Sequence, residues 1–354
     1  MSFLPLLNEE QRMLHEAVAG FATDVVAPSV AACEHSMGFS QAVVAEMSAL
    51  GLFAVTLPED RGGAGAGFVV HAAAVHALAQ VQGACAGILA AQVIGLEALQ
   101  HCAAENKLFD AAAQGTALIA PALRHGGQQV QMSRTSSAAM VTGVFHCVPF
   151  AGVAAAYVVE ARDAQGAALV LIRAGTPGVQ HARASEPLGM HGLALGALHL
   201  HDASGTVIAT GAALESVLSG GRIAVASLLG GVAQGALGHA RRYADEREQF
   251  GHAIINFGGV QERIARASVR AAALEALTAC AAAARGEQTG AHAALQARTL
   301  AATEAVLAAD DCLQVFGGFG LSREYPAERY LRDARFIGFG EYDAARAHSA
   351  LIGA

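Results

Sequence analysis

The chain has 354 residues, of which 54% are hydrophobic and 15% are charged, and its formal net charge is −8. This composition excludes an intrinsically disordered protein, because an apolar chain of this length can bury a core without disulfides. The acidic balance argues against nucleic-acid binding, which needs a basic face to neutralise phosphates. The six cysteines are scattered without metal-ligand spacing, so we expect no metal site.

Charged residues interrupt the long apolar stretches. The alanine run Ala281–Ala284 ends at Arg285, and Arg222 breaks another stretch just after a glycine pair. A membrane-spanning helix needs about 20 predominantly apolar residues. The N-terminus also lacks the basic segment and cleavage site of a signal peptide. We therefore expect no membrane span and a cytoplasmic protein.

Three stretches of the chain differ in their pattern, and we predict a domain for each. Residues 1–117 place apolar residues at helical spacing. One such stripe is formed by Leu14, Val18, Phe21 and Val25. Residues 118–212 contain short β-prone runs between turn residues. These runs lie at 141–148, 156–159, 169–172 and 197–202. Residues 213–354 return to helical patterns, with a break at Gly286–Gly290.

The order of helices, strands and helices predicts a mainly α protein with a small β-domain. It excludes the βαβ alternation of a doubly wound fold. The string Gly62-Gly-Ala-Gly-Ala-Gly67 follows a possible strand at Leu52–Leu57 and superficially matches a dinucleotide fingerprint. However, four residues separate the strand from the glycines, and no second strand with a ribose-binding acid follows. We interpret the string as a structural loop.

Two segments of the C-terminal third are candidates for ligand contacts. In Tyr243–Gly251, the side chains of Arg247 and Gln249 are donors that suit a phosphate, although Gly251 could simply cap a solvated helix end. In Leu313–Leu321, three glycines in four positions form either a tight interhelical turn or bare backbone that a flat ligand or a neighbouring chain can approach. Each segment alone is ambiguous.

Taken together and in order, the motifs resemble the acyl-CoA dehydrogenase family over nearly the whole chain. The segments that carry this resemblance are Asn8–Leu14, Leu50–Leu52, Leu57–Gly65, Leu188–Gly192, Gly220–Arg222, Glu246–Gly251, Gln314–Gly318, Glu324–Pro326, Glu328-Arg329 and Arg332-Asp333. The resemblance implies an N-terminal α-helical domain, a middle β-barrel-like domain and a C-terminal four-helix bundle.

The resemblance also implies FAD at the interface of a dimer or tetramer and an electron-transfer flavoprotein as the electron acceptor. By it, Arg247, Gln249 and Phe250 would reach the adenosine-diphosphate part of a neighbouring subunit's FAD. The residues expected to line the same part of the cofactor are Gln314, Gly317 and Gly318.

The family removes a proton from the α-carbon of an acyl-CoA thioester while a hydride leaves the β-carbon for flavin N5. The base must be a carboxylate with a raised pKa. Glu341 lies eight residues after Asp333, the position that the resemblance implies for this base, although it could be an ordinary surface glutamate. Other members carry the base on the long helix, where this chain has Gly220 or Gly221 and no acid.

Several departures from the family pattern keep alternatives open. Tyr342-Asp343 replace the usual Gly-Thr, and Ala120–Gly127 contains no acidic residue. The strand that usually places a tryptophan against the flavin contains none, so Phe145 or His146 would have to substitute. A second hypothesis is therefore a partially degenerate partner subunit of a heteromeric acyl-CoA dehydrogenase, contributing cofactor and interface contacts. A third is a related flavin monooxygenase or nitroalkane-type oxidase.

Overall fold

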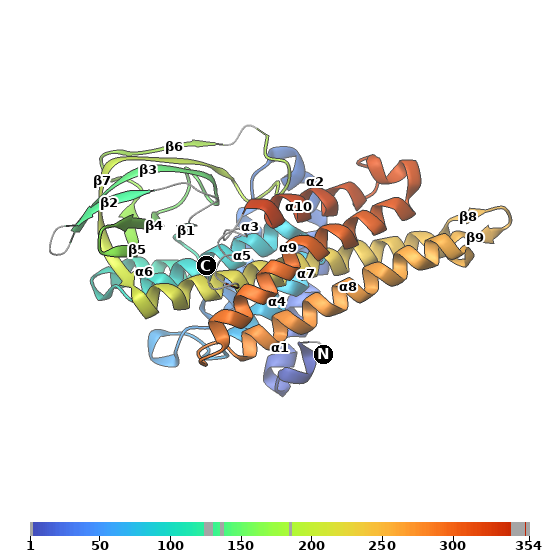
Figure 1. Cartoon of the computed structure of the whole chain (residues 1–354), viewed down its shortest axis with the longest axis horizontal. Helices are drawn as coiled ribbons and strands as arrows, with labels where there is room; N and C mark the ends of the chain where they lie inside the picture. Colours follow the sequence, from blue (N-terminus) through green and yellow to red (C-terminus); the bar gives the residue numbers. More distant parts are fainter. Residues whose placement is uncertain (1–2, 124–129, 135–137, 184–185, 341–350, 352–354) are drawn as a thin grey trace.

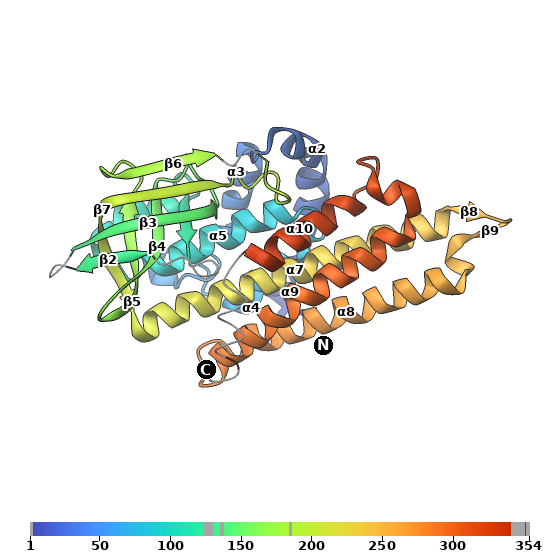
Figure 2. The ribbon, with the colours of Figure 1, turned by 45° about the horizontal axis from the view of Figure 1, so that its top comes forward.

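A computed structural model describes residues 3–123, 130–134, 138–183, 186–340 and 351 (Figure 1). The chain runs through helices, then strands, then helices, which confirms the predicted fold class. In both views the sheet lies at one end of the molecule and the long C-terminal helices extend away from it (Figures 1 and 2).

The N-terminal helices begin with a reciprocal cap. The Gln11 amide donates to the Asn8 side chain and the Asn8 amide donates to the Gln11 side chain, each at 2.9 Å. Val18 and Phe21 of the predicted stripe are buried, and Leu14 packs against the core. The helices are α1 (Glu9–Phe21), α2 (Ala27–Ser36), α3 (Gln41–Ala49), α4 (Phe68–Ala79), α5 (Gly83–Leu99) and α6 (Asn106–Ala113).

The predicted strand at Leu52–Leu57 is wrong. Leu52–Ala54 forms a 3₁₀ turn, and the chain then folds back so that the amide of Ala66 donates to the carbonyl of Val55. A short buried apolar run has no periodicity that separates a strand from a helical turn. The glycine string is a structural loop, since a Cβ on Gly63 would collide with the Leu57 backbone.

The strands form a seven-stranded sheet in the order β1-β4-β2-β3-β7-β5, and β4 also pairs with β5, which closes it into a barrel. The four β-prone runs fall within β3, β4, β5 and β7. Three short strands were not predicted, and β6 pairs with β7 outside the closed ring. The strands are β1 (Ile119–Ala122), β2 (Gln131–Arg134), β3 (Ala138–Val148), β4 (Ala156–Asp163), β5 (Gly166–Arg173), β6 (Val179–Arg183) and β7 (Gly196–Thr210).

The C-terminal helices pack together, with α9 against α7, α8 and α10. The predicted break at Gly286–Gly290 lies between α8 and α9. A small hairpin of β8 (Glu248–Gln249) and β9 (His252–Ala253) joins α7 to α8. The helices are α7 (Gly211–Glu246), α8 (Gly258–Ala283), α9 (Gly290–Val315) and α10 (Ala327–Gly340).

The secondary structure changes near the proposed domain limits. Helix α6 ends at Ala113 and β1 begins at Ile119, while β7 passes directly into α7 at Gly211. We keep 1–117, 118–212 and 213–354 as proposed domains on this basis.

Two helical stretches in the described chain are long and apolar enough to cross a membrane by length and composition. They are Glu9–Ser36 and α7, and the apolar window of α7 is 94% buried inside the protein. A buried core helix passes the same test, so these stretches are weak evidence for a membrane span.

Candidate functional site

A hollow of about 460 Å³, including its open part, lies between the barrel and helices α5 and α7. Its wall on α5 consists of three small residues at helical spacing, Gly87, Ala90 and Ala91. The remaining lining residues are Pro121, Leu123, Cys147, Pro149, Leu193, Val225 and Leu228. Among the described residues that line it, none has a charged side chain, and the Cys147 thiol is the one polar side-chain group. The described wall therefore suits an apolar ligand.

Two loops at this hollow hold strained backbone. Cys147 at the end of β3 and Phe150 just after it, and Met190 and Ala194 before β7, have positive φ values between 49° and 60°. The loops are joined by backbone hydrogen bonds, because the Phe150 amide donates to the Leu193 carbonyl at 3.2 Å and the next amide donates to Ala194 at 3.1 Å. Non-glycine residues in this conformation cost free energy and concentrate at binding sites.

The residues expected to stand in for the tryptophan do not line the hollow. Phe145 is buried in the core and His146 is exposed. A register shift between Phe145 and Val148 in the β3–β7 pairing changes which side chains face the hollow, so Cys147 and Pro149 form this wall. Sequence alternation assumes a regular strand and could not reveal the bulge.

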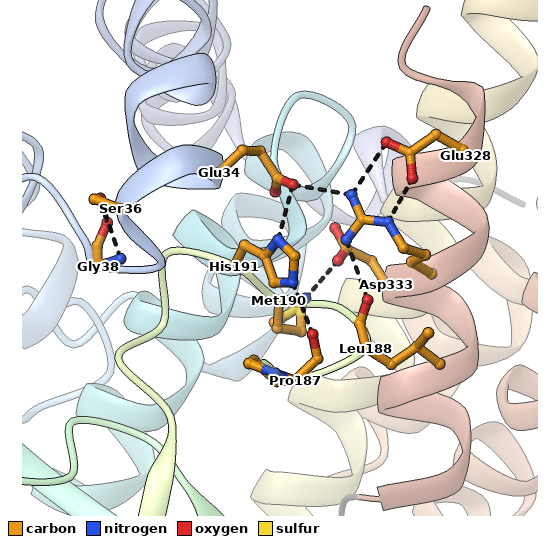
Figure 3. Close-up of polar contacts among 10 residues, drawn as sticks. Glu34, Ser36, Gly38, Pro187, Leu188, Met190, His191, Glu328 and Asp333 are labelled. Atoms are coloured by element: carbon orange, nitrogen blue, oxygen red, sulfur yellow. Dashed lines mark hydrogen bonds and ion pairs between the residues drawn. The ribbon is translucent and has the colours of Figure 1, made fainter. Parts of the chain in front are cut away.

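A polar cluster joins three separate parts of the chain, α2, α10 and the loop before β7 (Figure 3). Arg332 on α10 donates to Glu34 of α2 at 2.9 Å and to the Leu188 carbonyl at 3.1 Å. It also donates to Glu328 one helical turn away, at 2.5 Å. The ring of His191 contacts Glu34 at 3.2 Å and the Pro187 carbonyl at 2.7 Å. The cluster fixes α10 against the loop that follows β6.

Two further contacts hold α10. The carboxylate of Asp333, which is 2% exposed, accepts the Met190 amide at 2.6 Å. Burial raises the pKa of Asp333 to about 6, against the opposing effects of the Met190 amide and Arg329. At the C-terminal end, the buried Arg298 of α9 donates to the carbonyls of Ile337 and Gly338, at 3.1 and 3.3 Å.

The residue predicted to be the base, Glu341, lies outside the described residues, as do Tyr342, Asp343 and positions 124–127. Helix α10 is described up to the residue before it. A Cβ on Gly220 would point at Arg285, Ile94 and Phe68, so an acid there would meet a guanidinium.

The six predicted cofactor-contacting residues lie together at the far end of the bundle, all of them exposed. The tip formed by β8, β9 and their turn carries Phe250, whose side chain is 91% exposed. Phe250 and Gly251 both have positive φ, which forms a hairpin turn. The alternative in which Gly251 caps the helix is therefore wrong, because α7 ends at Glu246.

The second predicted segment reaches the same end. The Arg247 guanidinium lies over the Phe319 ring, 5.9 Å from its centroid, and Tyr243 stacks on Phe316 at 4.5 Å. A Cβ on Gly317 or Gly318 would meet nothing within 4 Å, so this backbone is open to a ligand. The candidates at this end are Arg247, Gln249, Phe250, Gln314, Gly317 and Gly318.

Figures 1 and 2 place the hairpin tip and the barrel at opposite ends of the molecule. The hollow beside the barrel and the exposed residues at the tip are therefore separate surfaces of one chain.

The chain is similar in sequence to acyl-CoA dehydrogenases over most of its length. Residues 8–108 match the N-terminal domain of acyl-CoA dehydrogenases, and residues 210–341 match their C-terminal domain. An acyl-CoA dehydrogenase of Bacillus subtilis is 29% identical over 354 residues, covering 93% of each chain.

Two solved structures share the fold at a TM-score of 0.89. One is described as the electron-transferring flavoprotein of Acidaminococcus fermentans, with 26% identity and coverage of 98% of this chain and 97% of that chain. The other is a glutaryl-CoA dehydrogenase from Mycobacterium smegmatis in complex with FADH2, with 20% identity and coverage of 99% and 96%.

The fold and the matches define a flavoprotein oxidoreductase that acts on acyl-CoA. The chain belongs to the acyl-CoA dehydrogenase family, and its cofactor is FAD. The residues present fit this cofactor. The apolar hollow suits a flat ring, and the open glycine backbone beside an exposed arginine suits a diphosphate.

Proposed function

We propose that this protein desaturates an acyl-CoA thioester between its α- and β-carbons, with Glu341 as the base. The observation that carries the proposal is the apolar hollow between α5, α7 and the barrel, in a chain of this family. Its walls exclude water from an acyl group. A carboxylate brought into such surroundings has a raised pKa and can take a weakly acidic proton.

The chain's own residues would bind, orient and deprotonate the substrate. The small side chains of Ala90 and Ala91 leave room for the acyl chain, and Glu341 removes the α-proton. Bound FAD supplies the hydride acceptor. Arg298 supports this assignment, because it holds the carbonyls of Ile337 and Gly338 just before Glu341. We propose an electron-transfer flavoprotein as the next electron acceptor, by family membership.

We further propose that each FAD is shared by two chains in a dimer or tetramer. The flavin ring would occupy the hollow of one chain, and the tip of another chain would hold the adenosine-diphosphate part. Arg247, Phe250 and the open backbone of Gly317 support this, because they lie exposed at the end of the molecule that is far from its own hollow.

A larger side chain in the hollow should weaken substrate binding. We expect Ala91→Leu to raise KM for acyl-CoA about tenfold, since overpacking a filled site costs about 1–3 kcal/mol. The measurement is a steady-state comparison across straight-chain acyl-CoA substrates. Ala42→Leu, on an exposed position of α3, is the matched control and should leave KM unchanged. An unchanged KM for Ala91→Leu would mean that the acyl group binds elsewhere.

Loss of the tip arginine should weaken FAD binding. We expect Arg247→Ala to raise the Kd for FAD about tenfold, because hydrogen bonds to charged groups are worth about 1.5–3 kcal/mol. Titration of the apoprotein with FAD, followed by flavin fluorescence, gives the constant. Arg162→Ala, an exposed arginine on the barrel, should bind FAD as the unmodified protein does. Equal affinities in both variants would remove the tip from the cofactor site.

The heteromeric alternative is favoured by one observation: the described wall of the hollow offers only the Cys147 thiol as a polar group to a flavin. The visible absorption spectrum and oligomer mass of the chain purified alone separate the two arrangements. About one FAD per chain in a homo-oligomer supports the homomer. A colourless protein that gains flavin only with a homologous partner supports the heteromer.

A further inference from the structure

The buried carboxylate of Asp333 sits at a junction of three elements. One oxygen accepts the Met190 amide at 2.6 Å. The other lies at the N-terminal end of α5, 3.0 Å from where a Cβ on Gly83 would be. No side chain caps this end of α5, so the carboxylate meets the positive end of the helix dipole. Asp333 thus connects α10, the loop before β7 and α5.

The loop residue that Asp333 holds is strained and fills a specific place. Met190 has φ +59°, a conformation that needs support from its surroundings. Its side chain packs on α5, because a Cβ on Gly87 would lie 2.8 Å from the Met190 Cε. Gly189 lies against the Arg332 carbonyl, at 2.6 Å from an added Cβ, so the loop also contacts the backbone of α10.

From Met190 the contacts continue into the wall of the hollow. The Leu193 amide donates to the Met190 carbonyl at 3.1 Å, and Leu193 lines the hollow. The Leu193 carbonyl in turn accepts the Phe150 amide, next to Pro149 in the opposite wall. Three lining residues, Gly87, Leu193 and Pro149, are therefore reached from Asp333 through consecutive contacts.

We propose that Asp333 is a positioning residue that sets the wall of the hollow by fixing Met190. The inference rests on the proposed function, in which this hollow receives the acyl group beside the flavin. Asp333 touches neither ligand. It acts through the hydrogen bond to the strained amide and the packing of the Met190 side chain on α5.

The charges around Asp333 make its ionisation part of this role. On α10 it is near Arg329, Tyr330 and Arg332, and from α2 it faces Glu34. Burial outweighs the two arginines and raises the pKa of Asp333 to about 6. Above this pH the charged carboxylate is the stronger acceptor for the Met190 amide.

The test compares two substitutions in the holoenzyme. Asp333→Ala removes the acceptor, and we expect kcat/KM to fall about 10- to 100-fold, with a shifted flavin absorption band, since small misplacements near a site have effects of this size. Asp333→Asn keeps an acceptor oxygen without the charge and should recover part of the loss. The KM of the unmodified enzyme should rise as the pH falls through about 6, a change that the Asn variant lacks.

The control is Asp311→Asn, a carboxylate of α9 that is 6% exposed and is not among the residues that line the hollow. It should lower the melting temperature and leave the flavin band and KM unchanged. If Asp333→Ala behaves like this control, Asp333 is a structural residue only. If folded Asp333→Asn is no better than Asp333→Ala, the hydrogen bond does not transmit the effect. If the proposed function is wrong, the unmodified enzyme and all variants will show no turnover with acyl-CoA. The flavin band will then still show whether Asp333 sets the wall of the hollow.

Discussion

Glu341→Gln is expected to abolish most turnover while FAD stays bound. Glutamine has the size of glutamate but cannot accept the α-proton, and general-base catalysis contributes about 10²- to 10⁴-fold to a rate. Mixing the FAD-loaded variant with acyl-CoA in the absence of an acceptor should leave the flavin absorbance unbleached over the time in which the unmodified enzyme bleaches. The apparent Kd for FAD should not change.

Glu287→Gln is the matched control, since this exposed glutamate lies in the turn between α8 and α9. It should bleach at the normal rate. Undiminished bleaching in Glu341→Gln would remove Glu341 from the reaction, and a different carboxylate would then have to enter the hollow. Loss of FAD in the variant would indicate a binding defect and leave the base to be tested by single-turnover rates at saturating FAD.

Asp311→Asn is expected to lower the free energy of unfolding by about 1.5 kcal/mol, the low end for hydrogen bonds to a charged group, because the surrounding arginines are partly exposed. Asp311 on α9 is 6% exposed and accepts from three arginines of α8. Arg266 donates to it at 2.6 and 3.2 Å, Arg270 at 2.7 Å and Arg263 at 3.2 Å. Asparagine leaves three guanidinium groups around one neutral amide. Chemical denaturation at pH 7 gives the change.

The effect of Asp311 should depend on pH in a defined direction. Burial acts to raise the pKa of Asp311, but Arg266, together with Arg270 and Arg263, outweighs burial and holds the pKa below its usual value. A lowered pKa means that the stabilisation is complete above about pH 3.8 and is lost as the pH falls through the folded-state pKa. The stability gap between the protein and Asp311→Asn should therefore narrow below pH 4.

The neighbouring Asp310→Asn is the control, because this side chain is exposed on the same helix and should change stability by less than about 0.5 kcal/mol. Equal effects of the two substitutions would mean that the arginines find other partners when Asp311 is neutral.

Elements of the fold could be predicted from the sequence where apolar residues recur over several helical turns. The apolar stripe predicted a helix in which Val18 and Phe21 are buried and Leu14 is partly buried. The glycines at 286–290 separate α8 from α9. Short buried runs could not be assigned, because Leu52–Leu57 has the composition of a strand and forms a turn. The four-residue strands β1 and β2 gave no alternation long enough to recognise.

The residues at the tip could be predicted from the sequence, whereas those that line the hollow could not. The tip residues are local motifs with unusual composition, such as the glycines at 317 and 318, and the structure brings them together with Arg247. The hollow is assembled from five separate segments whose alanines, prolines and leucines carry no chemical signature. Only the three-dimensional contacts reveal it, along with the role of Cys147, which depends on a bulge in β3.

The separation of tip and hollow has an evolutionary consequence under the shared-cofactor arrangement. A substitution in the hollow alters the site of its own chain, whereas one at Phe250 or Gly317 alters the site of a neighbour. In a homo-oligomer a single gene encodes both the hollow and the tip, so selection maintains both surfaces. After gene duplication, one copy can lose a working hollow and the other a working tip. Each chain then needs the other to bind the cofactor. Because the two surfaces lie at opposite ends of the molecule, a homo-oligomer of this protein can evolve into an obligate heteromer.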